Sequence, residues 1–391
     1  MKYDIITLKK HSSFYIIVTI TIIIVVVTII KGNCNFELIG RWICKATISE
    51  DNMTTLKNIA MEANVSVTTV SNVIHGNHKR VAQETVEKIK KLIERDNYVP
   101  NMIARSLVNK SSKIIGVINH VVPGKGGNFI SDPFNSVVID GIEEKLREKG
   151  YYLMVRTVYS EDDLFLLLRN WNIDGLILIG LFQDEFFERL MDASIPFVLI
   201  DSYVVNHQVL NIGLDDCKGG YIATKYLIDK GHRNIVFASP IIKKSGVVEE
   251  RFRGYNMALK EANIRFNSKN VYQQEITITE GIELGHELSN RTDVSAIFAT
   301  ADILAAGIIS GLNEKGKRVP DDFSVVGFDD LYISSLTAPR LTTIHQDILQ
   351  KGKVAVESLI NVIQGDLIKS YNVILPVTLI ERNSVKDINK N

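Results

Sequence analysis

The sequence predicts a large doubly wound α/β domain preceded by a small all-α module. From residue 113 onward, short apolar segments alternate with amphipathic ones, which is the pattern of parallel strands with helices on both faces of the sheet. Upstream, residues 53–76 (MTTLKNIAMEANVSVTTVSNVIHG) show two short helical segments separated by a tight turn. The length of 391 residues fits two or three domains and allows a large core.

Charge is unevenly distributed although the total is balanced. Lys plus Arg number 45, as do Asp plus Glu, so net charge alone gives no argument for a nucleic-acid partner. Residues 53–112, however, carry nine basic and five acidic side chains, a net charge of +4 that suits phosphate contact or simply a solvated basic face. Cys34, Cys44 and Cys217 show no metal-ligand spacing, which favours a reducing compartment.

The first 52 residues contain an uncharged run, Phe14–Ile30, between Lys10 and Lys31. Its length is at the short end of the range for a membrane-spanning helix. It is either a membrane anchor with a cytoplasmic remainder, or upstream sequence before a true translation start at Met53. We favour the second interpretation, because Met53 stands at the natural start of the helical module.

Three helices are expected in residues 53–98: Leu56–Ala63 with Thr55 as N-cap, Val67–Ile74 with Ser66 as cap, and Gln83–Asp96. The first two helices would pack through Ile59, Ala60, Ala63, Val65, Val70 and Val73. Val67, Thr68, Thr69 and Asn72 then face outward, and such short side chains let a helix enter the DNA major groove. The alternative is an ordinary helical hairpin.

Residues 99–112 form the predicted connection between the domains. Pro100 disfavours continuation of the preceding helix. Ala104 and Leu107 lie three residues apart beside Arg105, an arrangement that suits entry into the DNA minor groove by an apolar wedge. A plain linker is the alternative interpretation.

In the large domain, the informative polar residues are those that follow strands, because ligands of doubly wound sheets bind outside the carboxyl ends of strands. The expected strands are Ile114–Asn119, Tyr152–Val155, Gly175–Ile179, Phe197–Ile200, Val209–Ile212, Ile235–Ala238, Ala296–Ala299 and Ser324–Phe328, and the expected helices are Asn135–Lys149, Lys218–Lys230, Glu250–Ala262 and Ile303–Lys315.

Three aspartates at such positions, with an arginine and a phenylalanine elsewhere on the same rim, could bind a polyol by hydrogen bonds and ring stacking. Asp201, Asp302 and Asp329 follow strands, Arg251 lies near the start of a helix, and Phe134 lies in the loop before the first large helix. For Asp302, helix N-capping is an equally good explanation.

The run from TLKNIAMEANVSVTTVSNVIHG through YVPNMIARSL resembles the headpiece and hinge of the LacI/GalR (lactose-repressor) family of bacterial transcription regulators. The resemblance implies that Val67, Thr68 and Asn72 read bases and that Thr55 and Thr69 contact the DNA backbone. It also implies that Leu107, with Ala104 beside it, enters the minor groove. Asn72 stands where many members carry arginine, so the operator sequence does not follow from the resemblance.

Within a predicted effector-binding and dimerisation domain at 113–391, residues 113–385 resemble the periplasmic-binding-protein-like effector domain of the same family, through DPFNSVVIDGIEE, YLIDKGHRNIVFA, ERFRGY, VPDDFSVVGFDD and LTTIHQD. The implied fold has two subdomains with three chain crossings, which we place near Asp201, at 344–347 and at 371–374. The implied effector-binding residues are Phe134, Asp201, Arg251 and Asp329. Ala301 stands where sugar-responsive members often carry a polar residue.

The expected protein is therefore a cytoplasmic, homodimeric, operator-binding repressor controlled by a sugar-like effector, with no cofactor and no catalytic residues. The main alternative is a membrane-tethered or exported sugar-binding receptor, which would not need residues 53–107. An enzyme is disfavoured because we find no GxGxxG run opening a helix, no GxxxxGK[ST] and no nucleophile elbow. His345 is expected to be structural.

Overall fold

The computed structural model describes residues 54–74, 76–77, 79–98, 111–120, 129–204, 209–367 and 370–390. The chain divides into two compact units, Met1–Asn101 and Met102–Asn391. The apolar run Phe14–Ile30 and the predicted hinge residues Ala104 and Leu107 lie outside the described residues. Within the described ranges, no helix combines the length and the apolar character needed to cross a membrane.

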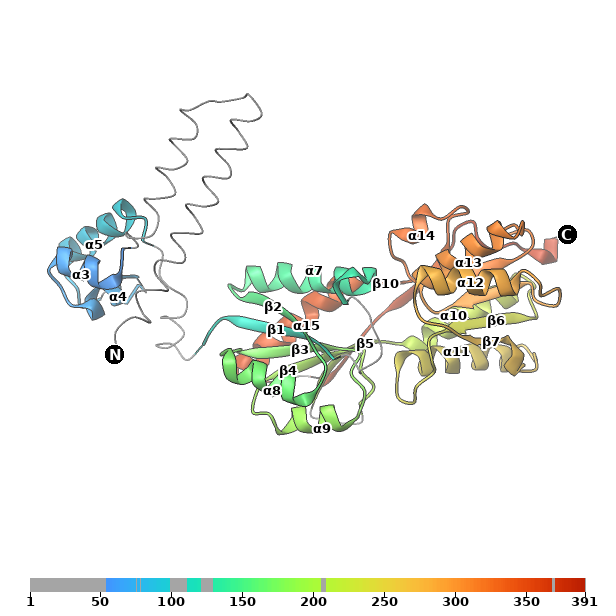
Figure 1. Cartoon of the computed structure of the whole chain (residues 1–391), viewed down its shortest axis with the longest axis horizontal. Coiled ribbons are helices and arrows are strands. Elements are labelled where there is room, and N and C mark those ends of the chain that lie inside the picture. Colours follow the sequence, from blue (N-terminus) through green and yellow to red (C-terminus); the bar gives the residue numbers. More distant parts are fainter. Residues whose placement is uncertain are drawn as a thin grey trace, which may run out of the picture. The chain divides into compact units, whose positions relative to one another are not determined.

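The described residues of the first unit form three helices, α3 (Leu56–Ala63), α4 (Val67–Ile74) and α5 (Gln83–Arg95) (Figure 1). The first two have the predicted bounds, and the third ends one residue earlier than predicted. Their shared core consists of Ile59, Ala60, Ala63, Val70, Val73, Val86, Ile89 and Leu92. The three helices thus close around one small apolar cluster, as their spacing predicts.

Two caps set the turn between α3 and α4. The Thr55 hydroxyl accepts a hydrogen bond from the Asn58 N–H at 3.3 Å at the start of α3. Asn64 ends α3 in the left-handed conformation with φ 56°, which asparagine tolerates better than most residues. The Ser66 hydroxyl then accepts from the Thr69 N–H at 3.0 Å at the start of α4. Both predicted N-caps are confirmed.

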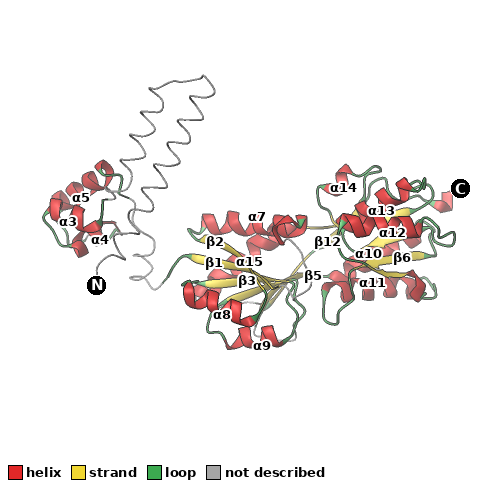
Figure 2. Cartoon of the chain, in the orientation of Figure 1, coloured by secondary structure: helices red, strands yellow, loops and turns green. Residues whose placement is uncertain are grey.

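In the second unit, the part of the chain that the structure describes forms two six-stranded sheets (Figure 2). The first has the order β11-β5-β4-β3-β1-β2 and is wholly parallel. Its strands are β1 (Ile114–His120), β2 (Tyr152–Val158), β3 (Gly175–Ile179), β4 (Phe197–Ile200), β5 (Leu210–Leu214) and β11 (Asn372–Leu375). We call this sheet and its helices α7 (Pro133–Glu148), α8 (Glu161–Asn170), α9 (Glu185–Asp192) and α15 (Ile348–Gln364) the first lobe.

The second sheet has the order β12-β10-β9-β8-β6-β7 and is parallel except for β12, which runs antiparallel to β10. Its strands are β6 (Ile235–Ser239), β7 (Val271–Gln273), β8 (Ala296–Ala299), β9 (Ser324–Asp329), β10 (Thr342–Gln346) and β12 (Val377–Ile380). With α10 (Asp216–Asp229), α11 (Val247–Glu261), α12 (Ile278–Leu288), α13 (Asp302–Glu314) and α14 (Ile333–Leu336), it forms the second lobe.

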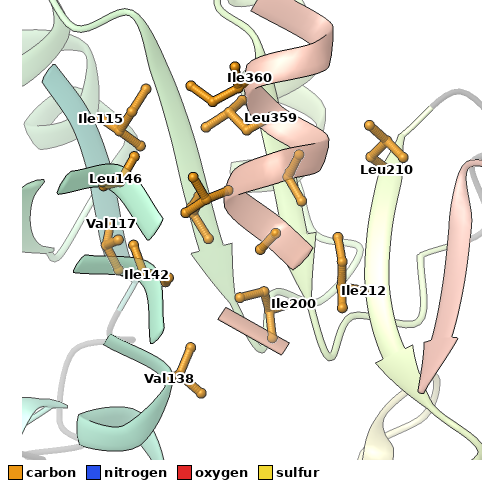
Figure 3. Close-up of a cluster of buried hydrophobic side chains, with 14 of the residues drawn as sticks. Ile115, Val117, Val138, Ile142, Leu146, Ile200, Leu210, Ile212, Leu359 and Ile360 are labelled. Atoms are coloured by element: carbon orange, nitrogen blue, oxygen red, sulfur yellow. The ribbon is translucent and has the colours of Figure 1, made fainter. Parts of the chain in front are cut away.

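Each sheet is covered by helices on both faces. Successive strand residues point to opposite sides of a sheet, so these apolar strands have two apolar faces that must be buried. In the first lobe, α7 and α15 pack with Ile115 and Val117 on one face (Figure 3), and α8 and α9 pack with Ile118 on the other. In the second lobe, α10 and α11 cover one face and α12 and α13 the other. The predicted doubly wound class is confirmed.

The three crossings between the lobes correct one sequence expectation. The first does not lie near Asp201: after β4 the chain continues into β5, which pairs with β4, and leaves the first sheet only between Leu214 and Asp216. A strand followed by an aspartate occurs at both β4 and β5, so the pattern alone was ambiguous. The second crossing joins β10 to α15, as predicted. The third joins β11 to β12, just beyond the predicted 371–374.

Helices α7 and α15 pack backbone to backbone through two glycines. A Cβ on Gly141 would stand 2.2 Å from the Leu349 carbonyl oxygen, and one on Gly352 would stand 2.4 Å from that of Val138. Only glycine permits this approach. The contact fixes the first turns of α15 against α7, and therefore places Lys351, which lies in those turns.

Candidate functional sites

The outer face of α4 presents the predicted base-reading residues to solvent. Val67 is 41% exposed, and Thr68 and Asn72 are also exposed, whereas Val70 and Val73 on the opposite side are buried. Among the described residues, neither the Thr68 hydroxyl nor the Asn72 amide has a hydrogen-bond partner. These side chains are therefore available to an external partner.

Thr55 and Thr69, the predicted DNA-backbone contacts, both lie at helix starts. Thr55 is exposed, while Thr69 is half-buried with its hydroxyl 2.9 Å from that of Ser66. A helix N-terminus presents N–H groups and a partial positive charge, which favour a phosphate. Not every basic side chain of the first unit is available to a phosphate, however. Arg95 donates two hydrogen bonds to the Glu62 carboxylate, at 2.5 and 2.6 Å.

In the second unit, two of the predicted effector residues belong to one polar chain that links the lobes. Asp201, at the end of β4, accepts two hydrogen bonds of 2.8 Å from the Lys351 ammonium. Lys351 also donates to the Gln346 side-chain oxygen at 2.7 Å, and the Gln346 amide donates to Asp329 at 2.6 Å. Asp201 and Asp329, 128 positions apart in the sequence numbering, are thus connected by two intermediate side chains.

Arg251 anchors a second polar chain between the lobes. Its Nε donates to Asp216 at 2.8 Å and its Nη1 donates to the Thr300 carbonyl at 2.7 Å, while the guanidinium carbon lies 3.5 Å from the centre of the Phe328 ring. The Tyr203 hydroxyl, from the first lobe, donates to the same Asp216 at 2.7 Å. Arg251 is 8% exposed and Asp216 is 1% exposed, so the ion pair is shielded from water.

Phe134 lies beside the first chain. It is half-buried in the first turn of α7, where Asp132 caps the helix by accepting from the Phe134 N–H at 2.8 Å. The Lys351 ammonium lies 5.3 Å from the centre of the Phe134 ring, within range of a cation–π interaction. The structure therefore groups Phe134 with Asp201 and Asp329.

Burial dominates the electrostatics of this region. It raises the pKa of Asp329 to about 7, although the positive charge of Arg251 and the hydrogen bond from Gln346 act in the opposite direction. Burial likewise raises the pKa of Asp216, against the attraction of Arg251. Because Arg251 acts on both carboxylates, and Asp201 and Lys351 also act on Asp216, the two polar chains form one electrostatic unit.

Asp302, Ala301 and His345 have structural roles inside the second lobe. Asp302 is the first residue of α13 and its carboxylate accepts from the Thr343 hydroxyl at 2.6 Å and the Leu331 N–H at 2.8 Å, so it braces neighbouring strands and does not cap its own helix. Ala301 precedes it without a side-chain cap. His345 pairs with Asp330 at 2.9 Å, in agreement with the expected structural role.

The sequence reasoning missed Lys351, Gln346, Asp216 and Tyr203. One signal could have revealed Lys351. The buried face of α15 contains Ile348, Gly352, Ala355, Val356, Leu359 and Ile360, and Lys351 lies on that same face. A charge on an apolar helical stripe requires a buried partner.

Two family models match the chain. "Bacterial regulatory proteins, lacI family" matches residues 55–101, and "Periplasmic binding protein-like domain" matches residues 224–385. The HTH-type transcriptional repressor PurR of Mannheimia succiniciproducens is 34% identical over 343 residues, which cover 86% of this chain and 100% of the relative. The ribose operon repressor of Haemophilus influenzae is 31% identical over 341 residues, 85% and 99% of the two chains.

The chain belongs to the lacI family of bacterial regulatory proteins. It is a DNA-binding transcriptional regulator with an N-terminal helix-turn-helix region and a periplasmic-binding-protein-like domain. This chain is similar to a chain of the lac repressor dimer bound to operator and the anti-inducer ONPF, with TM-score 0.74 at 26% identity. The comparison covers 86% of this chain and 100% of the other. The transcriptional regulator CelR in complex with cellobiose gives TM-score 0.63 at 28% identity, with 85% and 99% covered.

Proposed function

We propose that this lacI-family regulator is a homodimeric repressor whose affinity for an operator is set by a sugar or a sugar derivative. The observation that carries the proposal is that one chain contains both features: an outward-facing helix α4 in the first unit, and a buried group of carboxylates, a guanidinium and an aromatic ring in the second. The first suits base edges and the second suits hydroxyl groups.

On the operator, Val67, Thr68 and Asn72 contact base edges, and Thr55 and Thr69 contact phosphates. Ala104 and Leu107, which lie outside the described residues, enter the minor groove. A helix-turn-helix dimer reads two half-sites related by its own two-fold symmetry. The lac repressor dimer bound to operator supports this assignment.

In the effector site, Phe134 stacks on the face of the sugar, while Asp201, Arg251 and Asp329 bind its hydroxyls. Support comes from the complexes of relatives: CelR with cellobiose, and a lacI-family regulator from Enterococcus faecium with ribose (28% identity, TM-score 0.62, 70% of this chain and 99% of the other covered). Effector binding changes the angle between the lobes and thereby changes the free energy of the DNA-bound state. A coupling of about 1–3 kcal/mol suffices.

The proposal includes no catalytic step and no cofactor, and it places the protein in the cytoplasm, where it reaches the chromosome. It predicts that the protein is a dimer.

The test is fluorescence anisotropy of the purified protein on duplexes from the region upstream of its own gene, against scrambled duplexes of the same composition. Leu107→Ala should weaken binding to the preferred duplex far more than binding to the scrambled one. Equal losses on both would contradict the hinge assignment. No preference for any upstream duplex, with or without D-ribose, D-cellobiose, sugar phosphates or nucleobases, would contradict the proposal itself.

A further inference from the structure

Lys351 is a lysine in an unusual environment. Lys351 is 0% exposed, and it lies on the buried face of α15 between apolar neighbours. An ammonium group has three N–H donors, and Lys351 has three acceptor contacts: both oxygens of Asp201 and the Gln346 oxygen, at 2.7–2.8 Å. The donors are all engaged, so Lys351 does not have a free N–H to offer an effector.

These contacts cross between the lobes. Lys351 and Asp201 belong to the first lobe, whereas Gln346 ends β10 in the second lobe. Asp347, the next residue, is the N-cap of α15 and lies in the second crossing. A change of angle at this crossing must rotate the Gln346 side chain relative to α15, and the Lys351–Gln346 hydrogen bond resists that rotation.

The polar chain of Asp201, Lys351, Gln346 and Asp329 ends on two carboxylates that the effector is proposed to bind. Asp201 and Asp329 already accept hydrogen bonds from Lys351 and Gln346. A carboxylate oxygen has two lone pairs, so a hydroxyl group can share one of these oxygens with Lys351 or Gln346. A shared oxygen holds each donor less strongly, and in this sense the effector competes with the link between the lobes. A ligand shifts a conformational equilibrium only through contacts that differ between the states, and this competition supplies such a difference.

We propose that Lys351 is the positioning residue that holds the second crossing in one geometry, and that the effector acts by weakening the Asp201–Lys351–Gln346–Asp329 polar chain. This inference rests on the proposed function for the effector and for its binding to Asp201 and Asp329. The link itself, and its effect on the angle between the lobes, concern the free protein.

The closing experiment measures the distance between the lobes in the full chain without effector or operator. Spin labels are placed on Asp162→Cys in α8 and Glu287→Cys in α12, after Cys34, Cys44 and Cys217 are replaced by serine. Labelled chain is mixed with excess unlabelled chain, so that each assembly carries one labelled pair. Electron–electron double resonance then gives the distance distribution.

Three variants separate the cross-lobe link from general stability. Asp201→Asn with Lys351→Met removes both charges together, which avoids leaving one of them buried and unpaired. Gln346→Met breaks the cross-lobe hydrogen bond but keeps the Lys351–Asp201 pair. Lys353→Met is the matched control, because Lys353 lies two residues further along α15 and pairs with Glu144, within the first lobe, at 2.8 Å.

The double variant and Gln346→Met should each give a new distance population, or a shift larger than the width of the parent distribution. Lys353→Met should coincide with the parent. The proposal is overturned if both test variants melt as cooperatively as the parent yet keep its distribution, or if Lys353→Met shifts equally. A shifted distribution in a protein that binds no operator would refute the proposed function and leave the link standing.

Discussion

The two candidate sites differ in how far the protein itself occupies them. On α4, the exposed side chains of Thr68 and Asn72 are not engaged by other described residues. In the second unit, Asp201, Asp216 and Asp329 all accept hydrogen bonds from protein donors. A DNA partner on α4 would therefore displace mainly water, whereas the proposed effector would bind carboxylates whose hydrogen bonds also stabilise the fold. Changes on α4 should alter binding alone, and changes in the second unit should alter binding and stability together.

The largest effect is expected for Arg251→Met. This change leaves the carboxylate of Asp216 buried without its cationic partner, and breaking a buried pair in this way costs about 3–5 kcal/mol. Chemical denaturation of the variant against the parent measures the loss. Arg253→Met is the control, since Arg253 is exposed and pairs with Glu250 on the same helix. Equal stability of the two variants would show that the buried pair is not a stabilising element.

The next effect concerns pH and Asp329. Its folded-state pKa of about 7 lies above the ordinary value of 3.8, so the folded protein binds the proton more tightly than the unfolded chain. The resulting stability is fully present below about pH 4 and is lost as pH rises through about 7, with an upper bound of about 4 kcal/mol.

Asp329→Asn should remove this part of the pH dependence, which denaturation between pH 4 and pH 8 will reveal. Asp162→Asn serves as the control, because the Asp162 side chain is 92% exposed. If the pH profile of Asp329→Asn matches that of the parent, the carboxyl group ionises in the folded protein at its ordinary pKa.

A smaller effect, confined to binding, is expected on α4. Thr68→Ala and Asn72→Ala should each weaken binding to the preferred duplex by about 1–3 kcal/mol, the usual contribution of one base contact. Thermal melting should stay unchanged, because neither side chain supports the core. Met61→Ala is the control, since Met61 is 74% exposed on α3. A lower melting temperature in either α4 variant would break the distinction between the two sites.

The smallest effect is expected for Glu62→Gln. The Glu62–Arg95 pair joins α3 and α5, and both side chains are about half exposed. Ion pairs in water contribute little, because solvent screens them and ordering the side chains costs entropy. Thermal melting of the variant should therefore match that of the parent. A clear loss of melting temperature would mean that this pair holds the headpiece together.

The sequence determined the elements whose periodicity is local. Helices α3 and α4 and strands β3, β4 and β8 have the predicted bounds, because alternation and 3.6-residue spacing are read from neighbouring residues. Helices α8, α9, α12 and α15 were not assigned. Asp201, which follows β4, and Asp329, the last residue of β9, lie in one hydrogen-bond network, but their role in effector binding stays a prediction.

Only the tertiary structure decided how that network is wired. Lys351 lies 150 positions from Asp201, and their contact depends on the close packing of α15 on α7 at Gly141 and Gly352. The site of the first crossing likewise depended on whether β5 pairs with β4 or leaves the sheet. Local patterns report which face of a strand or helix is buried, but not which distant partner buries it, because that choice is made by the packing of the whole domain.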